Sequence, residues 1–289
     1  MKEKLKKIYN FSGTWTGTIV IVLFIIFFVV QAFVIPSGSM QRTLLVGDLL
    51  FAKKFSYGIP IPRLPFTNTA IFPDIFNNGH IIEGKRPKRG DIVIFLNPND
   101  NRENFVKRCF AVGGDEVIFM ENELYLHHNE GDEYIRENYD ESKIISMLGK
   151  LWVKNPYMDK YPGINYDPHP RNVLVMDKML EEKYNEYGIK IGTIGMEDIM
   201  INEFELYYNS RNIRFNAFYT KVDNDNFFMI GDNRNNSTDS RFIGAIPYKL
   251  IIGKPWFIYF SWDENRSPRW DRVGSFVSNI EKTNPKYMD

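Results

Sequence analysis

The chain has 289 residues, of which 44% are hydrophobic and 15% aromatic, and its formal net charge is zero. This length and apolar content are enough for a sizeable core and one or two domains. A neutral chain gives no reason to expect a nucleic acid or an acidic surface as its partner. The single cysteine, Cys109, excludes an intramolecular disulfide.

The histidines of the chain do not form a recognisable metal-binding motif. They are His80, His127, His128 and His169, and none has the His-Glu-x-x-His spacing. One cysteine cannot build a structural zinc site. The adjacent His127 and His128 would point to opposite faces of a strand. We therefore expect no metal and no other cofactor.

An apolar stretch from Trp15 to Ile35 follows a lysine-rich N-terminus. As a helix, about 21 residues measure ~30 Å, which is enough to span a bilayer. We predict a transmembrane anchor helix at residues 15–35, with residues 1–14 on the cytoplasmic side. A cleavable signal peptide is the alternative, but Ala32-Phe33-Val34 lacks the small-x-small pattern of its cleavage site. The N-terminal lysines favour this orientation, although Arg42 and further lysines follow the stretch.

From Leu44 onward the sequence is typical of β structure. Short apolar runs rich in β-forming residues are bounded by Gly and Asp turns, at 49–52, 91–95, 105–112, 117–119, 124–126, 227–230, 250–253 and 255–260. Glu121-Asn122-Glu123 separates two of these runs and indicates a hairpin. Many short strands without regularly alternating helices predict a mainly β domain, barrel-like or sandwich.

Three segments are less informative. The proline-punctuated loop 57–66 either contacts the membrane surface or packs on its own domain. Residues 130–226 are charged, rich in tyrosine and irregular, with weak helical patterns such as 177–187 and no functional signature. The polar tail after Trp262 is expected to be poorly ordered.

Two serines stand in the turn Pro36-Ser37-Gly38-Ser39-Met40, directly after the apolar stretch. Serines one residue apart can present a nucleophile and a hydrogen-bond donor to the same carbonyl group. We take Ser39 as the candidate nucleophile, with the Ser37 hydroxyl and the Ser39 backbone N–H as oxyanion donors. Spacing alone also allows the two serines to exchange roles, and the same residues are typical of a polar turn beside a membrane.

No histidine is suited to activate such a serine, but a neutral lysine can do so, as in Ser-Lys dyads. Lys107 is the candidate base. Strand alternation places Phe105, Lys107 and Cys109 on one otherwise apolar face. Burial there would lower the pKa of the amine from ~10.4. From the strand alone, a lysine at a sheet edge with its amine in water is an equal alternative.

The segment from Gly231 to Arg241 is dense in side chains that bond backbone groups. Such residues brace tight turns. One of its hydroxyls could orient a lysine amine, and Asp239 could pair with Arg241 to support the loop. A self-braced surface loop is the alternative.

In their order, these segments resemble the sequence boxes of bacterial type I signal peptidases. The matching segments are Pro36-Ser37-Gly38-Ser39-Met40 after one anchor helix, Lys88-Arg89-Gly90-Asp91-Ile92-Val93-Ile94-Phe95, Val106-Lys107-Arg108 with Gly113-Gly114-Asp115, and Gly231-Asp232-Asn233-Arg234-Asn235-Asn236-Ser237-Thr238-Asp239-Ser240-Arg241. The resemblance implies a membrane-bound serine endopeptidase that cleaves N-terminal signal peptides from exported preproteins after small-x-small motifs. Arg42 departs from the family, which usually has proline there.

The resemblance also assigns roles to the residues of these boxes. Ser39 would be the nucleophile, Lys107 the general base and Ser37 part of the oxyanion hole. The loop would contribute Ser237, to orient the lysine amine, and Asp232, Asp239 and Arg241, to keep its shape.

The implied fold is an anchor helix followed by a catalytic β domain that contains an inserted second β subdomain. We predict the catalytic domain at 36–115 and 227–289, the latter including the tail, and the insert at 116–226. The implied location is the bacterial inner membrane, single-pass, with the catalytic domain on the periplasmic side. The partners would be preproteins and the lipid bilayer, without nucleic acid or metal. Alternatives are a specialised relative that processes one pilin or conjugation protein, and a catalytically silent, membrane-tethered β-domain that binds partners.

Overall fold

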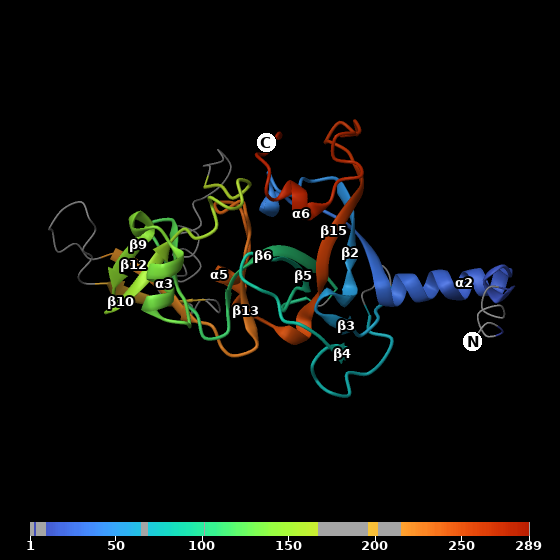
Figure 1. Cartoon of the computed structure of the whole chain (residues 1–289), viewed down its shortest axis with the longest axis horizontal. Coiled ribbons are helices and arrows are strands. Elements are labelled where there is room, and N and C mark those ends of the chain that lie inside the picture. Colours follow the sequence, from blue (N-terminus) through green and yellow to red (C-terminus); the bar gives the residue numbers. More distant parts are fainter. Residues whose placement is uncertain are drawn as a thin grey trace, which may run out of the picture.

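The computed structural model describes Glu3 and residues 10–64, 69–100, 102–166, 196–201 and 215–288. Its strands form a seven-stranded sheet, in the order β1-β2-β15-β5-β6-β13-β14, and a six-stranded sheet, in the order β11-β12-β7-β8-β10-β9. Strands β3 (Gly58–Pro60) and β4 (His80–Glu83) form a separate pair. In Figure 1 the seven-stranded sheet lies between the six-stranded sheet and a projecting helix, α2. This architecture confirms the prediction of a mainly β protein.

The seven-stranded sheet is built from both ends of the chain. Its strands are β1 (Val30–Val34), β2 (Asp48–Lys53), β5 (Ile92–Leu96), β6 (Asn104–Val112), β13 (Asn226–Ile230), β14 (Ile246–Pro247) and β15 (Ile251–Ser261). The two strands expected at 250–253 and 255–260 are a single strand, β15. Its pairing with β2 shifts register between Pro255 and Phe257, because proline cannot donate a ladder hydrogen bond.

The six-stranded sheet lies within the segment predicted as an insert. Its strands are β7 (Glu116–Met120), β8 (Glu123–His127), β9 (Ile144–Met147), β10 (Lys150–Lys154), β11 (Glu197–Ile201) and β12 (Phe215–Lys221). The expected hairpin joins β7 and β8, with Glu121 and Asn122 at φ 50° and 65° as a tight hairpin turn requires. The helical pattern at 177–187 lies outside the described residues.

One hydrophobic core joins the two sheets. It contains Phe110 of β6 and Phe228 of β13 together with Phe119 of β7 and Phe218 of β12. Short helices complete the fold at α3 (Asp132–Asn138), α5 (Ser240–Ile243), α6 (Val277–Ile280), η2 (Gly38–Met40), η3 (Lys54–Ser56), η4 (Glu141–Lys143) and η5 (Tyr248–Leu250). Both sheets therefore pack as parts of one body.

The N-terminal helix is shorter than the predicted 15–35. Helix α2 (Trp15–Phe24) continues as a π-helical turn (Ile25–Val29), and the chain then becomes strand β1. The prediction of helix is wrong for Val30–Val34, because their backbone pairs with β2 and β-branched and aromatic side chains suit a strand. Among the described residues, no helix combines the length and apolar character that crossing a bilayer requires.

Two further segments bear on the predictions made for loop 57–66 and for the tail. Residues 57–62 pack on their own domain, since Tyr57 and Ile61 are buried. The tail after Trp262 is ordered rather than loose, because Arg272 pairs with Asp48 and Glu281 pairs with Arg108 in buried salt bridges.

Candidate active site

The serine turn continues directly from strand β1. The backbone of Ile35 bonds that of Asp48, and Ser39 then lies in the 3-10 turn η2. Met40, the next residue, is buried in the core with Ile35 and Leu44. Packing of Ile35 and Met40 in the core therefore holds the serine turn in place, while Ser39 itself remains 9% exposed.

Strand β6 brings Lys107 to this turn. The Lys107 Nζ lies 2.6 Å from the Ser39 Oγ, and the Ser37 Oγ lies 3.4 Å from the same oxygen. Among the described residues, the hydrogen bond of the lysine amine goes to Ser39 and not to Ser37. This geometry favours Ser39 over Ser37 as the nucleophile.

The environment of Lys107 disfavours its charged form. Lys107 is 4% exposed, and its amine lies 5.1 Å from the centre of the Phe105 ring on the same strand face. Burial lowers the pKa of Lys107 to about 8; the Asp239 and Asp232 charges raise it and the Arg241 charge lowers it further. At neutral pH a useful fraction of the amine is therefore free to accept a proton.

The loop after β13 holds the serine turn by its backbone. The Asn233 N–H donates to the Ser39 carbonyl at 3.1 Å, and the Asn233 side-chain amide donates to the Gly38 carbonyl at 3.1 Å. A side chain at Gly231 would clash with the Ser39 carbonyl and the Ser237 hydroxyl, so only glycine allows this approach. The sequence marked Asn233 as a brace of its own loop, but not as a support of the nucleophile.

Asp239 and Arg241 form the expected pair, and both are fully buried. Arg241 donates to Asp239 with two nitrogens at 2.8 Å each and also to the Arg234 carbonyl. Burial raises the pKa of the Asp239 carboxyl, but the Arg241 charge and hydrogen bonds bring it below its usual value. Ser237 is buried beside this pair, and no hydrogen bond joins it to Lys107 among the described residues.

Asp232 belongs to a second buried network, which the sequence did not indicate. Its carboxylate accepts two hydrogen bonds from Arg108 at 2.8 Å and one from the Thr43 hydroxyl at 2.7 Å. Arg108 follows Lys107 on β6 and so points to the opposite face. No role was assigned from the sequence to Arg108 or Thr43, although a charged residue within an apolar strand is a signal that could have indicated Arg108.

The backbone at Arg42 explains how this chain departs from the family pattern. Arg42 has a φ of 73°, in the left-handed region. Proline is locked near −65° and cannot adopt this angle. The turn after Ser39 therefore has a backbone conformation at residue 42 that a proline could not adopt.

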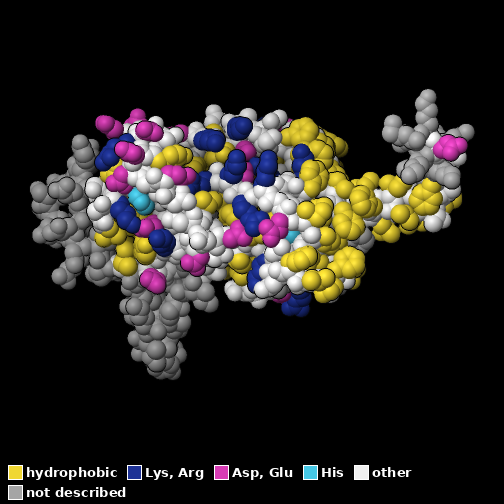
Figure 2. Space-filling model, turned by 60° about the horizontal axis from the view of Figure 1, so that its bottom comes forward, with side chains coloured by type: hydrophobic (Ala, Val, Ile, Leu, Met, Phe, Trp, Pro, Cys, Tyr) yellow, Lys and Arg dark blue, Asp and Glu magenta, His cyan; other side chains and the backbone are white. Residues whose placement is uncertain are grey.

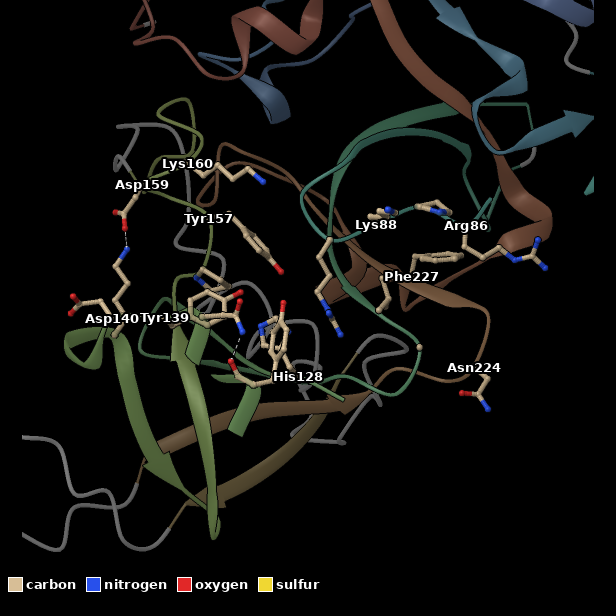
Figure 3. Close-up of a pocket in the computed structure, with 18 of the residues that line it drawn as sticks. Arg86, Lys88, His128, Tyr139, Asp140, Tyr157, Asp159, Lys160, Asn224 and Phe227 are labelled. Carbon is tan, nitrogen blue, oxygen red and sulfur yellow. Dashed lines mark hydrogen bonds and ion pairs between the residues drawn. The ribbon is translucent and has the colours of Figure 1, made fainter. Parts of the chain in front are cut away.

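A cavity of about 770 Å³ lies between the two sheets, and none of the predicted site residues lines it. Figure 3 shows Lys88 and Phe227 on one side of it and His128 and Tyr139 on the other. Asp115, His128 and Glu130 bring possible metal ligands within 4.8 Å of one another. Arg89 already bonds both carboxylates, at 2.7 Å and 2.8 Å, so its guanidinium supplies the positive charge there.

Comparison with known proteins places this chain in a family. The family model "Signal peptidase, peptidase S26" matches residues 8–262. A protein named Signal peptidase I from Helicobacter pylori is 43% identical over 295 residues, which cover 96% of this chain and 96% of that protein. Proteins of the same name from Buchnera aphidicola and Rickettsia typhi are 33% and 28% identical, covering 86% and 94% of this chain and 75% and 87% of theirs. The chain therefore belongs to the signal peptidase family, peptidase S26, and is a hydrolase of that family.

Proposed function

We propose that this chain is a membrane-bound endopeptidase with a Ser39–Lys107 dyad, which removes N-terminal signal peptides from exported preproteins. The observation that carries the proposal is the 2.6 Å contact between the Ser39 Oγ and a buried lysine amine whose pKa is lowered to about 8. A serine hydroxyl needs a neighbouring base to attack an amide, and a neutral lysine supplies one.

In the proposed reaction, the neutral Lys107 amine takes the proton of Ser39 as the Oγ attacks the scissile carbonyl carbon. The Ser37 hydroxyl, 3.4 Å from that Oγ, donates to the developing oxyanion. The lysine ammonium then gives its proton to the leaving amine, and the peptide bond breaks to leave an ester on Ser39. Lys107 next takes a proton from a water molecule as the water oxygen attacks the ester carbon. The bond to the Ser39 Oγ then breaks, the lysine ammonium gives its proton to that oxygen, and the other product leaves with a new carboxyl group.

The Gly231–Arg241 loop supports this chemistry in the proposal. Ser237 orients the lysine amine by rotation of its hydroxyl toward it. The buried Asp239–Arg241 pair keeps the loop in shape, and Asp232 holds Arg108 beneath it. The roles of Ser237, Asp232, Asp239 and Arg241 come from the family pattern, matched position by position, and the contact between Asp232 and Arg108 comes from the structure.

The substrate is expected to bind as an extended strand. Because side chains alternate along a strand, the first and third residues before the cut face the same wall. We propose that this wall accepts only small side chains, as the small-x-small motif of the family implies. Leucine at both positions should therefore stop cleavage.

We also propose that the N-terminal helix anchors the chain in the bacterial inner membrane, with the catalytic domain on the periplasmic side. Within α2 only Gly17 is buried, and the exposed side chains from Ile19 to Phe24 are apolar on every face, which is typical of a helix in lipid. Figure 2 shows hydrophobic side chains on this helix and on the adjoining end of the body. The loop before β4 adds Ile75 and Phe76, 80% and 71% exposed.

The test is cleavage of a purified preprotein by the detergent-solubilised full chain. Ser39→Ala should abolish cleavage without loss of folding, and the exposed Ser267→Ala is the matched control. A Ser39→Ala variant that keeps a tenth of the wild-type rate would reject Ser39 as the nucleophile. Cleavage of a single pilin-like substrate but of no generic preprotein would favour the specialised relative. No cleavage of either would favour the binding domain.

A further inference from the structure

The C-terminal segment is attached to the stretch that follows the catalytic serine. Arg272 donates two hydrogen bonds to the buried Asp48 carboxylate, at 2.9 Å and 2.6 Å. The same guanidinium donates to the Thr43 carbonyl at 3.1 Å. One arginine of the tail therefore holds the backbone four residues beyond Ser39.

A second connection reaches Thr43 from its side chain. Glu281, at the end of α6, accepts a hydrogen bond from Arg108 at 2.8 Å. Arg108 in turn binds Asp232 through two bonds, and Asp232 accepts the Thr43 hydroxyl. The guanidinium of Arg108 is thus held from both sides, by one carboxylate of the tail and one of the loop.

Apolar packing and the loop backbone continue these connections into the serine turn. Val277 of α6 belongs to the same core cluster as Ile35 and Met40, which flank the turn. The Thr43 and Leu44 N–H groups both donate to the Met40 carbonyl. On the other side, the residue after Asp232 is Asn233, whose amides bond Gly38 and Ser39. Hydrogen bonds and apolar packing therefore connect the tail to the serine turn.

We propose that Arg272 and Glu281 are positioning residues for the reaction: they hold Thr43 and Asp232, and through these groups they fix the Ser39 Oγ against Lys107. This inference rests on the proposed function. It gives the tail a role that its sequence, polar and without a motif, does not indicate. Since misplacement by about 1 Å far from the chemistry can cost ~10²-fold in rate, the loss should appear in kcat.

The test compares Arg272→Gln and Glu281→Gln in the detergent-solubilised full chain. Lys286→Gln is the matched control, because Lys286 belongs to the same tail but pairs with Asp271 at the surface, with 71% of its side chain exposed. We expect kcat to fall about 10- to 100-fold in both test variants, with KM within about twofold of wild type. Lys286→Gln should behave as wild type, and Arg272→Lys should restore part of the loss.

Two further measurements separate positioning from general destabilisation. Amide hydrogen exchange should accelerate at residues 37–44 in both variants but stay unchanged in β7, which lies in the other sheet. In a double-mutant cycle with Thr43→Val, the loss of kcat in the double variant should be smaller than the sum of the two single losses, because one of the two routes from Glu281 runs through the Thr43 hydroxyl.

The outcomes are distinct. Unchanged kcat in both variants, equal acceleration of exchange in β7, or fully additive effects in the cycle would each overturn the proposal. If Arg272→Gln does not fold, Glu281→Gln and its cycle decide alone. If the wild-type chain and Lys286→Gln cleave no preprotein, the proposed function fails, while the exchange measurement still tests whether the tail holds the serine turn.

Discussion

Acidification should reduce cleavage through the protonation of one group, Lys107. Its pKa of about 8 is set mainly by burial, and only the neutral amine can take the proton of Ser39. Half of the amine is neutral near pH 8, about one tenth at pH 7 and about one hundredth at pH 6. We therefore expect kcat/KM to fall tenfold per pH unit below the inflection and to reach a plateau above it.

Neighbouring groups do not produce the same inflection. Asp232 and Asp239 have pKa values below the usual range of a carboxyl, since their arginine partners outweigh burial. Both stay ionised from pH 6 to pH 9. The pKa of the buried His128 is lowered to about 4. None of these three groups therefore titrates near pH 8. Burial also lowers the pKa of Lys54 to about 8, so the Lys107 variant below identifies the amine on which the rate depends.

The assay is the initial rate of cleavage of a peptide that spans a signal-peptide cut, measured from pH 5.5 to 9.5. Each sample is returned to pH 8.5 afterwards, so that irreversible unfolding can be excluded. Lys107→Arg should be inactive at every pH, because a guanidinium does not lose its proton in proteins. An active Lys107→Arg enzyme, or a rate independent of pH between 6 and 8, would refute the role of Lys107 as a base.

Three other variants test single contacts. Ser37→Ala should lower kcat by ~10²–10³ with little change in KM, the usual loss of one oxyanion donor, whereas a raised KM at constant kcat would make Ser37 a substrate-binding residue. Asp239→Asn leaves the buried Arg241 charge without its partner and should cost about 3–5 kcal/mol in the free energy of unfolding by urea; a loss below about 1 kcal/mol would contradict the supporting role of the pair. Lys107→Met should be inactive yet more stable by roughly 3 kcal/mol at pH 7, because lowering the lysine pKa from 10.5 to about 8 makes its charged form costly when folded. The gain in the free energy of unfolding should be complete below pH 8 and should vanish above pH 10.5. A Lys107→Met variant that is less stable than wild type would show that favourable contacts hold the amine instead.

Much of the fold follows from local patterns in the sequence. Apolar runs bounded by glycine and aspartate gave the position of strands such as β5, β6 and β13. Strand β1 was missed because the apolar stretch from Trp15 continues through it, and an unbroken apolar run has no period that separates helix from strand. The pairing of β1 with β2, which makes this segment a strand rather than a helix, is a tertiary contact.

A residue of the candidate site could be predicted when its position depends on a single strand or a single turn. Alternation along β6 placed Lys107 on an apolar face, and the structure buries it beside Ser39. Contacts between remote segments were not predictable in this way. Arg272 and Glu281 bond residues 224 and 173 positions away, so no local pattern could give their burial.

The direct passage from α2 into β1 has a mechanical consequence. No flexible linker separates the helix from the sheet, because the π-helical turn ends at Val29 and the strand begins at Val30. Five strand residues extend about 17 Å, so β1 acts as a rigid spacer that sets the height of Ser39 above the end of the helix. Since strand side chains alternate, changing that height by one residue would also turn every following side chain to the opposite face. The distance between helix and nucleophile can therefore vary only in steps of two residues, about 7 Å each.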